Sequence, residues 1–213
     1  MSATIYKFTI LLGCLFATSN AWAQEGKIKK FFSLSGPEKV WVLTHPFIAG
    51  RTLKASVRAR EIAEKQEDSP DLDGFANGGQ VDAFRHCFWM ASLCQHIKEK
   101  KALKLGIAHE EGNEKDFKKR KDEDGDLPDA MANTMDLWNN QVGAMVNREN
   151  PGVAEEVLIS IVKEAVTSGR CKIIKRNSKG EFVDAGGKAI KREEWHGKWV
   201  NTRCLVESDK IDN

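Results

Sequence analysis

The sequence lacks an excess of charge of either sign. Its 213 residues include 33 Lys and Arg and 31 Asp and Glu, which gives a formal net charge of +2. Proteins that bind nucleic acids usually carry a basic surface, and this balance does not indicate one. The two basic clusters, at 98–101 and 118–121, contain or precede acidic residues and are typical of solvated faces. We therefore expect no nucleic-acid partner.

Long hydrophobic runs are also missing after the first 23 residues. Within those residues Lys7 is the only charge, the apolar segment 8–17 is too short to span a bilayer, and Ala21 and Ala23 precede Gln24. This pattern predicts a signal peptide over 1–23 that is cleaved after Ala23. We expect a periplasmic or secreted protein with no transmembrane segment in the mature chain. The alternative is a lipoprotein anchored through Cys14, because Leu-Leu-Gly-Cys at 11–14 resembles a lipobox.

Few cysteines remain after such cleavage: Cys87, Cys94, Cys171 and Cys204. Cys87 and Cys94 are seven residues apart on a predicted helix, about 10.5 Å along its axis, which is too far for a disulfide. Export permits disulfides, and Cys171 and Cys204 bracket the C-terminal segment. The sequence thus predicts a Cys171–Cys204 disulfide.

The hydrophobic pattern is helical over most of the chain, which predicts a mainly all-α fold with one helical domain. We expect a linker over 24–37, a helical domain over 38–170 that carries a polar site, and a disulfide-closed extension over 171–213. The expected helices include a short one from Pro37 that Pro46 ends or kinks, others at 51–66, 80–98, 101–110 and 128–147, and one that begins at Asn150-Pro151. A small β-hairpin is expected, with strands 172–175 and 181–184 and a turn at 177–180.

Two motifs of familiar hydrolases are absent. The chain has no G-x-S-x-G and no H-E-x-x-H, which disfavours serine hydrolases and zincin-type metalloproteases. Three predicted helices instead carry polar side chains that a hydrophobic core does not require. These candidate catalytic residues are Asp82, Arg85, His86, His109, Glu110, Asp136, Asn139 and Asn140.

If these helices pack together, the polar groups can work in two ways. A divalent metal such as zinc could be held by His86, His109 and Asp136, with Asp82 or Glu110 orienting a ligand or acting as base. Without a metal, His86 could activate water while Asp82 sets its tautomer, and Asn139 or Asn140 could bind the substrate or an oxyanion. Calcium is less favoured, because the acidic segment 122–129 lacks the glycine and glutamate positions of an EF-hand.

Four strings together resemble an uncharacterised bacterial domain family of small exported proteins and toxin-like C-terminal units. They are W-V-L-T-H-P at 41–46, D-A-F-R-H-x-x-W at 82–89, A-H-E at 108–110 and D-x-x-N-N-x-x-G at 136–143. The resemblance covers about residues 38–147 and implies an α-helical domain with a polar site built from these residues. It implies no reaction. The order of His86, His109-Glu110 and Asp136 is also similar to the H…HD…D layout of metal-dependent phosphohydrolases, with Glu in place of the first Asp.

The sequence favours a hydrolase that acts on a small-molecule or lipid substrate, either a phosphoester or a lipid ester. A non-catalytic binding protein, such as an inhibitor or an immunity-like factor, is the alternative. In an enzyme the polar cluster should line an open pocket, whereas a structural network should be sealed and hydrogen-bonded throughout.

Overall fold

The structure is a computed structural model that describes residues 30–120 and 127–211. Three predictions fall outside these ranges: the signal peptide with its cleavage after Ala23, the lipidation of Cys14, and the acidic segment 122–126.

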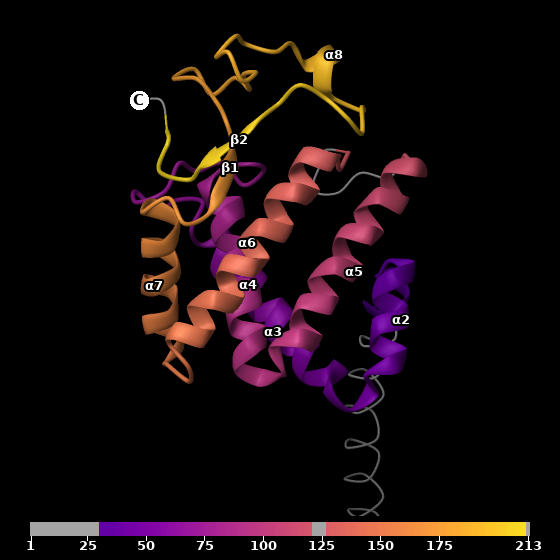
Figure 1. Cartoon of the computed structure of the whole chain (residues 1–213). Helices are drawn as coiled ribbons and strands as arrows, with labels where there is room; N and C mark the ends of the chain where they lie inside the picture. The colour runs from indigo at the N-terminus through magenta and orange to yellow at the C-terminus, as the bar shows by residue number, and fades with distance from the viewer. Residues whose placement is uncertain (1–29, 121–126, 212–213) are drawn as a thin grey trace, which may run out of the picture.

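The described residues form a mainly α-helical fold with one small sheet, as the sequence predicts (Figure 1). The helices α2 to α7 make up what we call the helical body, and residues 171–211 make up the C-terminal extension. The helices of the body are α2 (Gly36–Thr44), α3 (Pro46–Glu64), α4 (Gln80–His96), α5 (Glu99–Lys118), α6 (Ala130–Glu149) and α7 (Glu155–Thr167). The extension contains β1 (Lys172–Ile174), the short helix α8 (Arg192–Trp195) and β2 (Leu205–Glu207).

Helix α4 is the centre of the helical body and packs against α3, α5, α6 and α7. Ala83, Phe84, Cys87, Phe88 and Ala91 are all buried in the main core. A helix that is apolar around most of its circumference must be covered on most sides, as α4 is here. Because α4 is covered on most sides, its polar side chains Asp82 and His86 are buried too.

A glycine allows α4 and α6 to approach closely. A Cβ at Gly143 would collide with the backbone carbonyl of Cys87, and Met90 lies beside it. Only a residue without a side chain fits between the two helix backbones at this point. The position next to Cys87 is His86, so this close approach brings the polar face of α6 to the polar residues of α4.

Three helix boundaries differ from the sequence predictions. Helix α2 ends at Thr44, just before Pro46, as predicted, but α3 begins at Pro46 and not at residue 51. Helix α5 continues through Gly112 to Lys118, because Gly112 is buried where the side chain of Ser35 packs against it. Asn150 ends α6, and α7 begins only at Glu155. Packing outweighs the local preference of the residue at Gly112, and capping outweighs it at Asn150.

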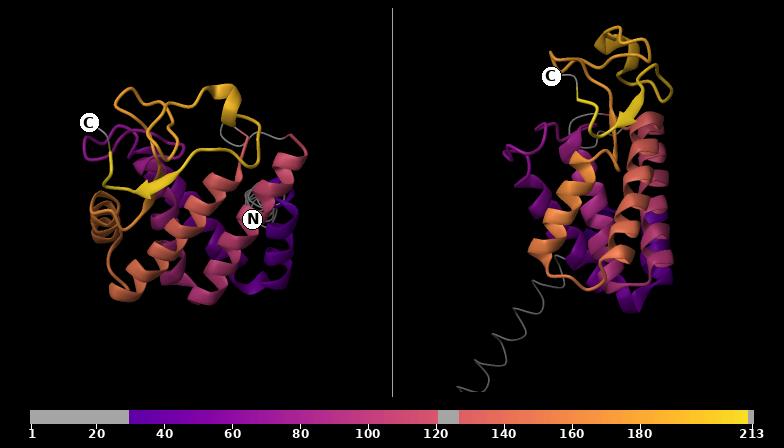
Figure 2. Two further views of the ribbon diagram at one scale, coloured as in Figure 1. Left: turned by 45° about the horizontal axis from the view of Figure 1, so that its top comes forward. Right: turned by 60° about the vertical axis from the view of Figure 1, so that its left-hand side comes forward.

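The C-terminal extension lies across one end of the helices in both orientations of Figure 2. Its strand β1 pairs in an antiparallel sense with β2, so that Ile173 faces Val206. The predicted hairpin partner 181–184 is therefore wrong for most of β1, and only an isolated bridge joins Arg176 to Phe182. The turn at 177–180 is present, closed by the Gly180 N–H that donates to the Asn177 carbonyl at 2.8 Å.

The strand register also separates the predicted disulfide partners. The Ser208 N–H donates to the Cys171 carbonyl, and the Lys175 N–H donates to the Cys204 carbonyl, so the two cysteines are not opposite each other. Both are free thiols in the structure. Cys171 is instead buried beside Cys87, and the hydrogen bond between the two thiols, together with burial, raises the pKa of Cys87 well above its ordinary value.

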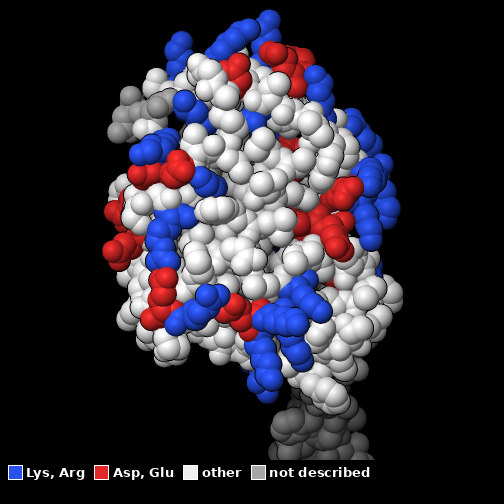
Figure 3. Space-filling view, in the orientation of Figure 1, with Lys and Arg blue, Asp and Glu red and all other residues white. Residues whose placement is uncertain are grey.

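The surface of the described residues carries mixed charge, and on the face in Figure 3 basic and acidic side chains are intermingled. No helix within residues 30–120 and 127–211 combines the length and the apolar character that crossing a membrane requires.

Candidate functional site

Two carboxylates and one imidazole meet where α4 and α6 cross. Asp82 and His86 are one turn apart on α4, and Asp136 comes from α6. His86 Nε2 lies 3.5 Å from Asp82 Oδ1 and 3.4 Å from Asp136 Oδ1. One ligand atom from each residue lies within 4.8 Å of the others, and all three residues are buried. We call these three residues the acid–histidine cluster.

The carboxylate of Asp82 is held in place by two donors. The backbone N–H of Gly78 donates to Asp82 Oδ2 at 2.7 Å, and Arg85 Nη2 donates to Asp82 Oδ1 at 2.7 Å. Arg85 lies on α4, three residues after Asp82, and its side chain also faces the site. The arginine balances part of the negative charge that two buried carboxylates bring together.

The surroundings of His86 favour the neutral form of its imidazole. Burial lowers the pKa of His86 well below its ordinary value, and the positive charges of Arg85 and His109 lower it further, against a smaller opposing contribution from Asn140. A neutral imidazole has one ring nitrogen with a lone pair, which can bind a metal ion or accept a proton. Among the described residues His86 Nδ1 has no hydrogen-bond partner of ordinary geometry.

The predicted ligand His109 is not a member of the acid–histidine cluster. Its Nδ1 lies 3.1 Å from Glu38 Oε1, and its ring centroid is 6.4 Å from that of His86. Burial alone would raise the pKa of Glu38, but the hydrogen bond and charge of His109 and the bonds from Ser35 outweigh it and lower the pKa. His109 therefore connects α5 to α2, and Asp82 takes the third position beside His86 and Asp136.

The remaining predicted site residues have other neighbours. Asn139 binds the backbone of β1: its Nδ2 donates to the Lys172 carbonyl at 2.9 Å, and its Oδ1 accepts from the Lys172 N–H at 2.8 Å. Glu110 is buried and accepts from Asn113 Nδ2 at 3.0 Å. Asn140 is buried beside His86 and Gly106. Asn140 thus belongs with the cluster, whereas Asn139 ties the extension to α6.

Asp129, the acid of the calcium candidate segment that the structure describes, caps a helix. Its Oδ1 accepts from the backbone N–H groups of Met131 and Ala132 at 2.9 and 3.0 Å, at the start of α6. Its Oδ2 pairs with Arg203 and accepts from Asn201. Both oxygens are used within the protein, and this favours a structural role.

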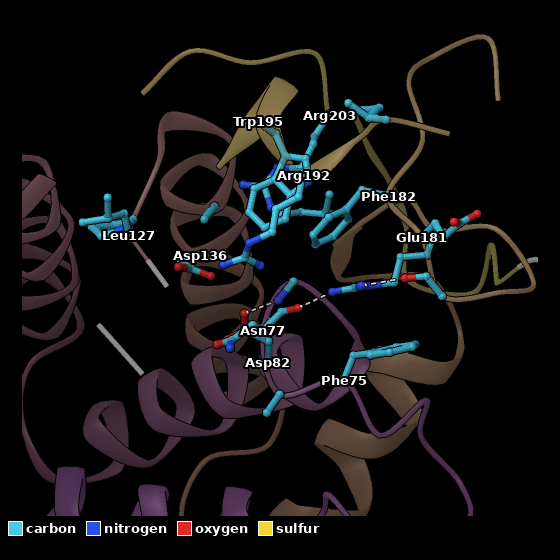
Figure 4. Close-up of a pocket in the computed structure, with 18 of the residues that line it drawn as sticks. Phe75, Asn77, Asp82, Leu127, Asp136, Glu181, Phe182, Arg192, Trp195 and Arg203 are labelled. Carbon is cyan, nitrogen blue, oxygen red and sulfur yellow. Dashed lines mark hydrogen bonds between the residues drawn. The ribbon is translucent and has the colours of Figure 1, made fainter. Parts of the chain in front are cut away.

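A cavity of about 580 Å³ opens directly on the acid–histidine cluster. Asp82 and Asp136 form part of its floor, and the C-terminal extension forms the opposite wall (Figure 4). The extension residues on this wall include Arg176, Phe182, Arg192, Trp195 and Arg203. Sequence analysis missed these five residues. These residues lie over the helix ends because β1 pairs with β2. No local pattern in the sequence indicates this pairing.

A second cavity, of about 560 Å³, lies on the other side of the same residues. His86, His109 and Trp89 line it together with apolar side chains of α2 and α3, and Arg85 lines both cavities. The imidazole of His86 is thus reached from one side and the two carboxylates from the other. Such open pockets are what a ligand-binding or catalytic site requires, and a sealed network would have neither.

Fold and site together define a small helical domain with a buried acid–histidine cluster at the bottom of an open pocket. The model of a family described as a domain of unknown function (DUF6973) matches residues 39–170. Since this is more than half of the chain, the protein belongs to that family. The match confirms the expectation of an uncharacterised domain, while the specific motifs and the association with toxins stay predictions. Neither curated proteins nor solved structures yielded a match.

Proposed function

We propose that this protein is a metal-dependent hydrolase in which Asp82, His86 and Asp136 hold a divalent ion such as zinc. The observation that carries the proposal is the spacing of the three ligand atoms. Separations of 3.4 and 3.5 Å are long for hydrogen bonds, which cluster near 2.7–3.2 Å. They match the distance of about 3.3–3.6 Å between ligands that each bind zinc tetrahedrally at roughly 2.0–2.2 Å.

The chemistry of the donor set supports the same proposal. Three protein ligands leave one of four tetrahedral positions for water, which is the pattern of catalytic rather than structural zinc sites. The neutral state of His86 favours metal binding, because no proton has to leave the imidazole first. A metal bound here would lower the pKa of its water and so supply a hydroxide near neutral pH.

The residues around the cluster have distinct roles in this proposal. Arg85 and the Gly78 N–H orient the carboxylate of Asp82, and Asn140 lies against the imidazole of His86. Second-shell contacts of this kind hold ligands in the geometry that a metal needs. The pocket above Asp82 and Asp136 would receive the ester to be cleaved. Export after cleavage at Ala23 is part of the proposal and would place the reaction outside the cytoplasm.

The test is the metal content of the purified protein by elemental analysis after zinc loading and removal of excess zinc. We expect about one equivalent in the wild type and its loss in Asp82→Asn, His86→Ala and Asp136→Asn, with each fold checked by circular dichroism. His109→Ala should keep the metal, and so should the exposed-residue control His96→Ala. A wild type without stoichiometric metal, or loss in His109→Ala with retention in Asp82→Asn, would contradict the proposed site.

Hydrolysis is tested on the same variants with an aryl phosphate and an acyl ester. We expect zinc-dependent turnover of at least one substrate by the wild type and none by Asp136→Asn. Metal binding without turnover of either ester class would favour the alternative, a non-catalytic binding protein in which the cluster is structural.

A further inference from the structure

The wall of the pocket that faces the acid–histidine cluster is rich in arginine. It belongs to the C-terminal extension, beyond residues 39–170 that the family model covers. Arg176, Arg192 and Arg203 come from three separate parts of the extension and all line the same cavity. Three arginines of the wall thus face the two carboxylates of the floor across one cavity.

Two of the arginines are built into the wall. The guanidinium of Arg176 lies between the rings of Phe75 and Phe182, 4.2 and 3.8 Å from their centroids, and donates to the Asn77 carbonyl at 2.9 Å. Arg203 is buried, pairs with Asp129, and lies 4.6 Å from the centroid of Phe182. These contacts hold the wall in place.

Arg192 is the arginine that points into the cavity. It is the first residue of α8, and its guanidinium carbon lies 5.4 Å from the centroid of the Trp195 ring. In Figure 4 its guanidinium is directed across the pocket toward the carboxylate of Asp136.

The charge of the pocket changes when a divalent ion is present. The ion would neutralise the charges of Asp82 and Asp136. Glu181 and Lys191, which also line the cavity, offset each other, so the arginines of the floor and wall would then leave the pocket positive. A cationic pocket with low-dielectric walls attracts an anionic ligand. The planar fork of an arginine fits the paired oxygens of a phosphate, whereas an uncharged acyl ester offers it no such partner.

We infer that the substrate is a phosphate ester whose non-bridging oxygens are bound by Arg192, next to the metal held by Asp82, His86 and Asp136. This inference rests on the proposed function and selects between its two ester classes. In the reaction the oxygen of water forms a new bond to phosphorus, and the bond from phosphorus to the ester oxygen breaks. For a monoester, the alcohol leaves with one proton of the water, and inorganic phosphate, which keeps the other proton, is the second product.

The experiment is a calorimetric titration of zinc-loaded protein, freed of excess zinc, with inorganic phosphate. The variant Arg192→Gln removes the fork, and Lys188→Gln removes the same charge from an exposed position of the extension outside the pocket. We expect Arg192→Gln to weaken phosphate binding roughly tenfold to a hundredfold. Lys188→Gln should bind phosphate as the wild type does, and both should bind zinc unchanged. Arg192→Lys, which keeps the charge but loses the fork, should lie between Arg192→Gln and the wild type.

Zinc and phosphate are titrated separately, so the two ideas can fail separately. Absence of zinc binding overturns the proposed function and, with it, the inference that rests on it. Zinc binding with no effect of Arg192→Gln on phosphate affinity overturns the inference alone. Equal phosphate affinity in the wild type and Arg192→Gln, or no phosphate binding by the wild type, overturns the inference. If Arg192→Gln does not fold, as shown by its near-ultraviolet circular dichroism, Arg192→Lys decides: wild-type affinity in that variant contradicts a role for the fork.

Discussion

The helical body and the C-terminal extension form opposite sides of one pocket, yet the contacts that stabilise each of them differ. The body is built from long helices around a continuous apolar core centred on α4. The extension has two strands of three residues and one short helix. It is attached through a smaller apolar cluster, in which Ile174 and Trp195 pack with Met135 of α6, and through polar contacts. Asn139 holds β1, Gln80 Nε2 donates to the Ser208 carbonyl at 2.7 Å, and Asp129 pairs with Arg203.

The site has two halves, the proposed metal ligands and the arginine wall, and different contacts stabilise each half. The proposed metal ligands are positioned by helix packing, which a single polar substitution outside the core should not disturb. The arginine wall depends on this small apolar cluster and on a small number of hydrogen bonds and ion pairs. Each of these polar contacts is worth on the order of 1–3 kcal/mol when its loss leaves a buried partner behind. The extension is therefore the part of the molecule that should open first.

The largest effect is expected from a substitution in the helical body, at the contact of α6 with α4. Gly143→Ala places a methyl group against the Cys87 carbonyl, so the two helices must separate. We expect a loss of about 1–3 kcal/mol or more in the free energy of unfolding, measured by denaturant titration, and weaker zinc binding. The control is Gly50→Ala on α3, where a Cβ meets nothing within 4 Å. It should be neutral or stabilising by about 0.5–1 kcal/mol. Equal stability of the two variants would contradict close helix packing as the basis of the site.

A second test addresses the attachment of the extension. Asn139→Ala removes two hydrogen bonds to the backbone of Lys172, and we expect a loss of about 1–3 kcal/mol. Hydrogen exchange should increase across 171–211 while α4 stays protected. The control Thr134→Ala, exposed on the same helix, should change stability by less than about 0.5 kcal/mol. Exchange that rises equally in α4 would mean that body and extension unfold as one unit.

The smallest expected effect comes from a polar contact within the body. The lowered pKa of Glu38 means that folding favours its carboxylate form, so its contribution to stability is complete above pH 4.5, its ordinary pKa. The contribution is lost as the pH falls below 4.5 through the lowered pKa of the folded state. Unfolding free energies measured from pH 6 down to pH 3 should fall more steeply for the wild type than for Glu38→Gln. Parallel curves would show that the contact with His109 does not stabilise the body.

Sequence reasoning identified residues better than it identified their partners. Asp82 and His86 were expected on one face because they are four positions apart on a helix, and the spacing is local. The prediction of His109 as the third ligand, in place of Asp82, is not local, because it depends on how α5 packs against α4. The structure turns His109 toward Glu38 of α2. Similarly, both thiols of the predicted Cys171–Cys204 pair are present, but the register of β1 against β2 sets them apart.

The sequence by itself determined the mainly helical fold, the apolar nature of α4 and the set of polar residues that its neighbours carry. These follow from the period of side chains along a helix, which any stretch of about a dozen residues reveals. Only the tertiary structure decided which of those residues meet and that Arg192 faces them across a pocket. These contacts join residues that are 50 or more positions apart. Their geometry depends on close packing at Gly143 and on strand pairing, neither of which leaves a local pattern in the chain.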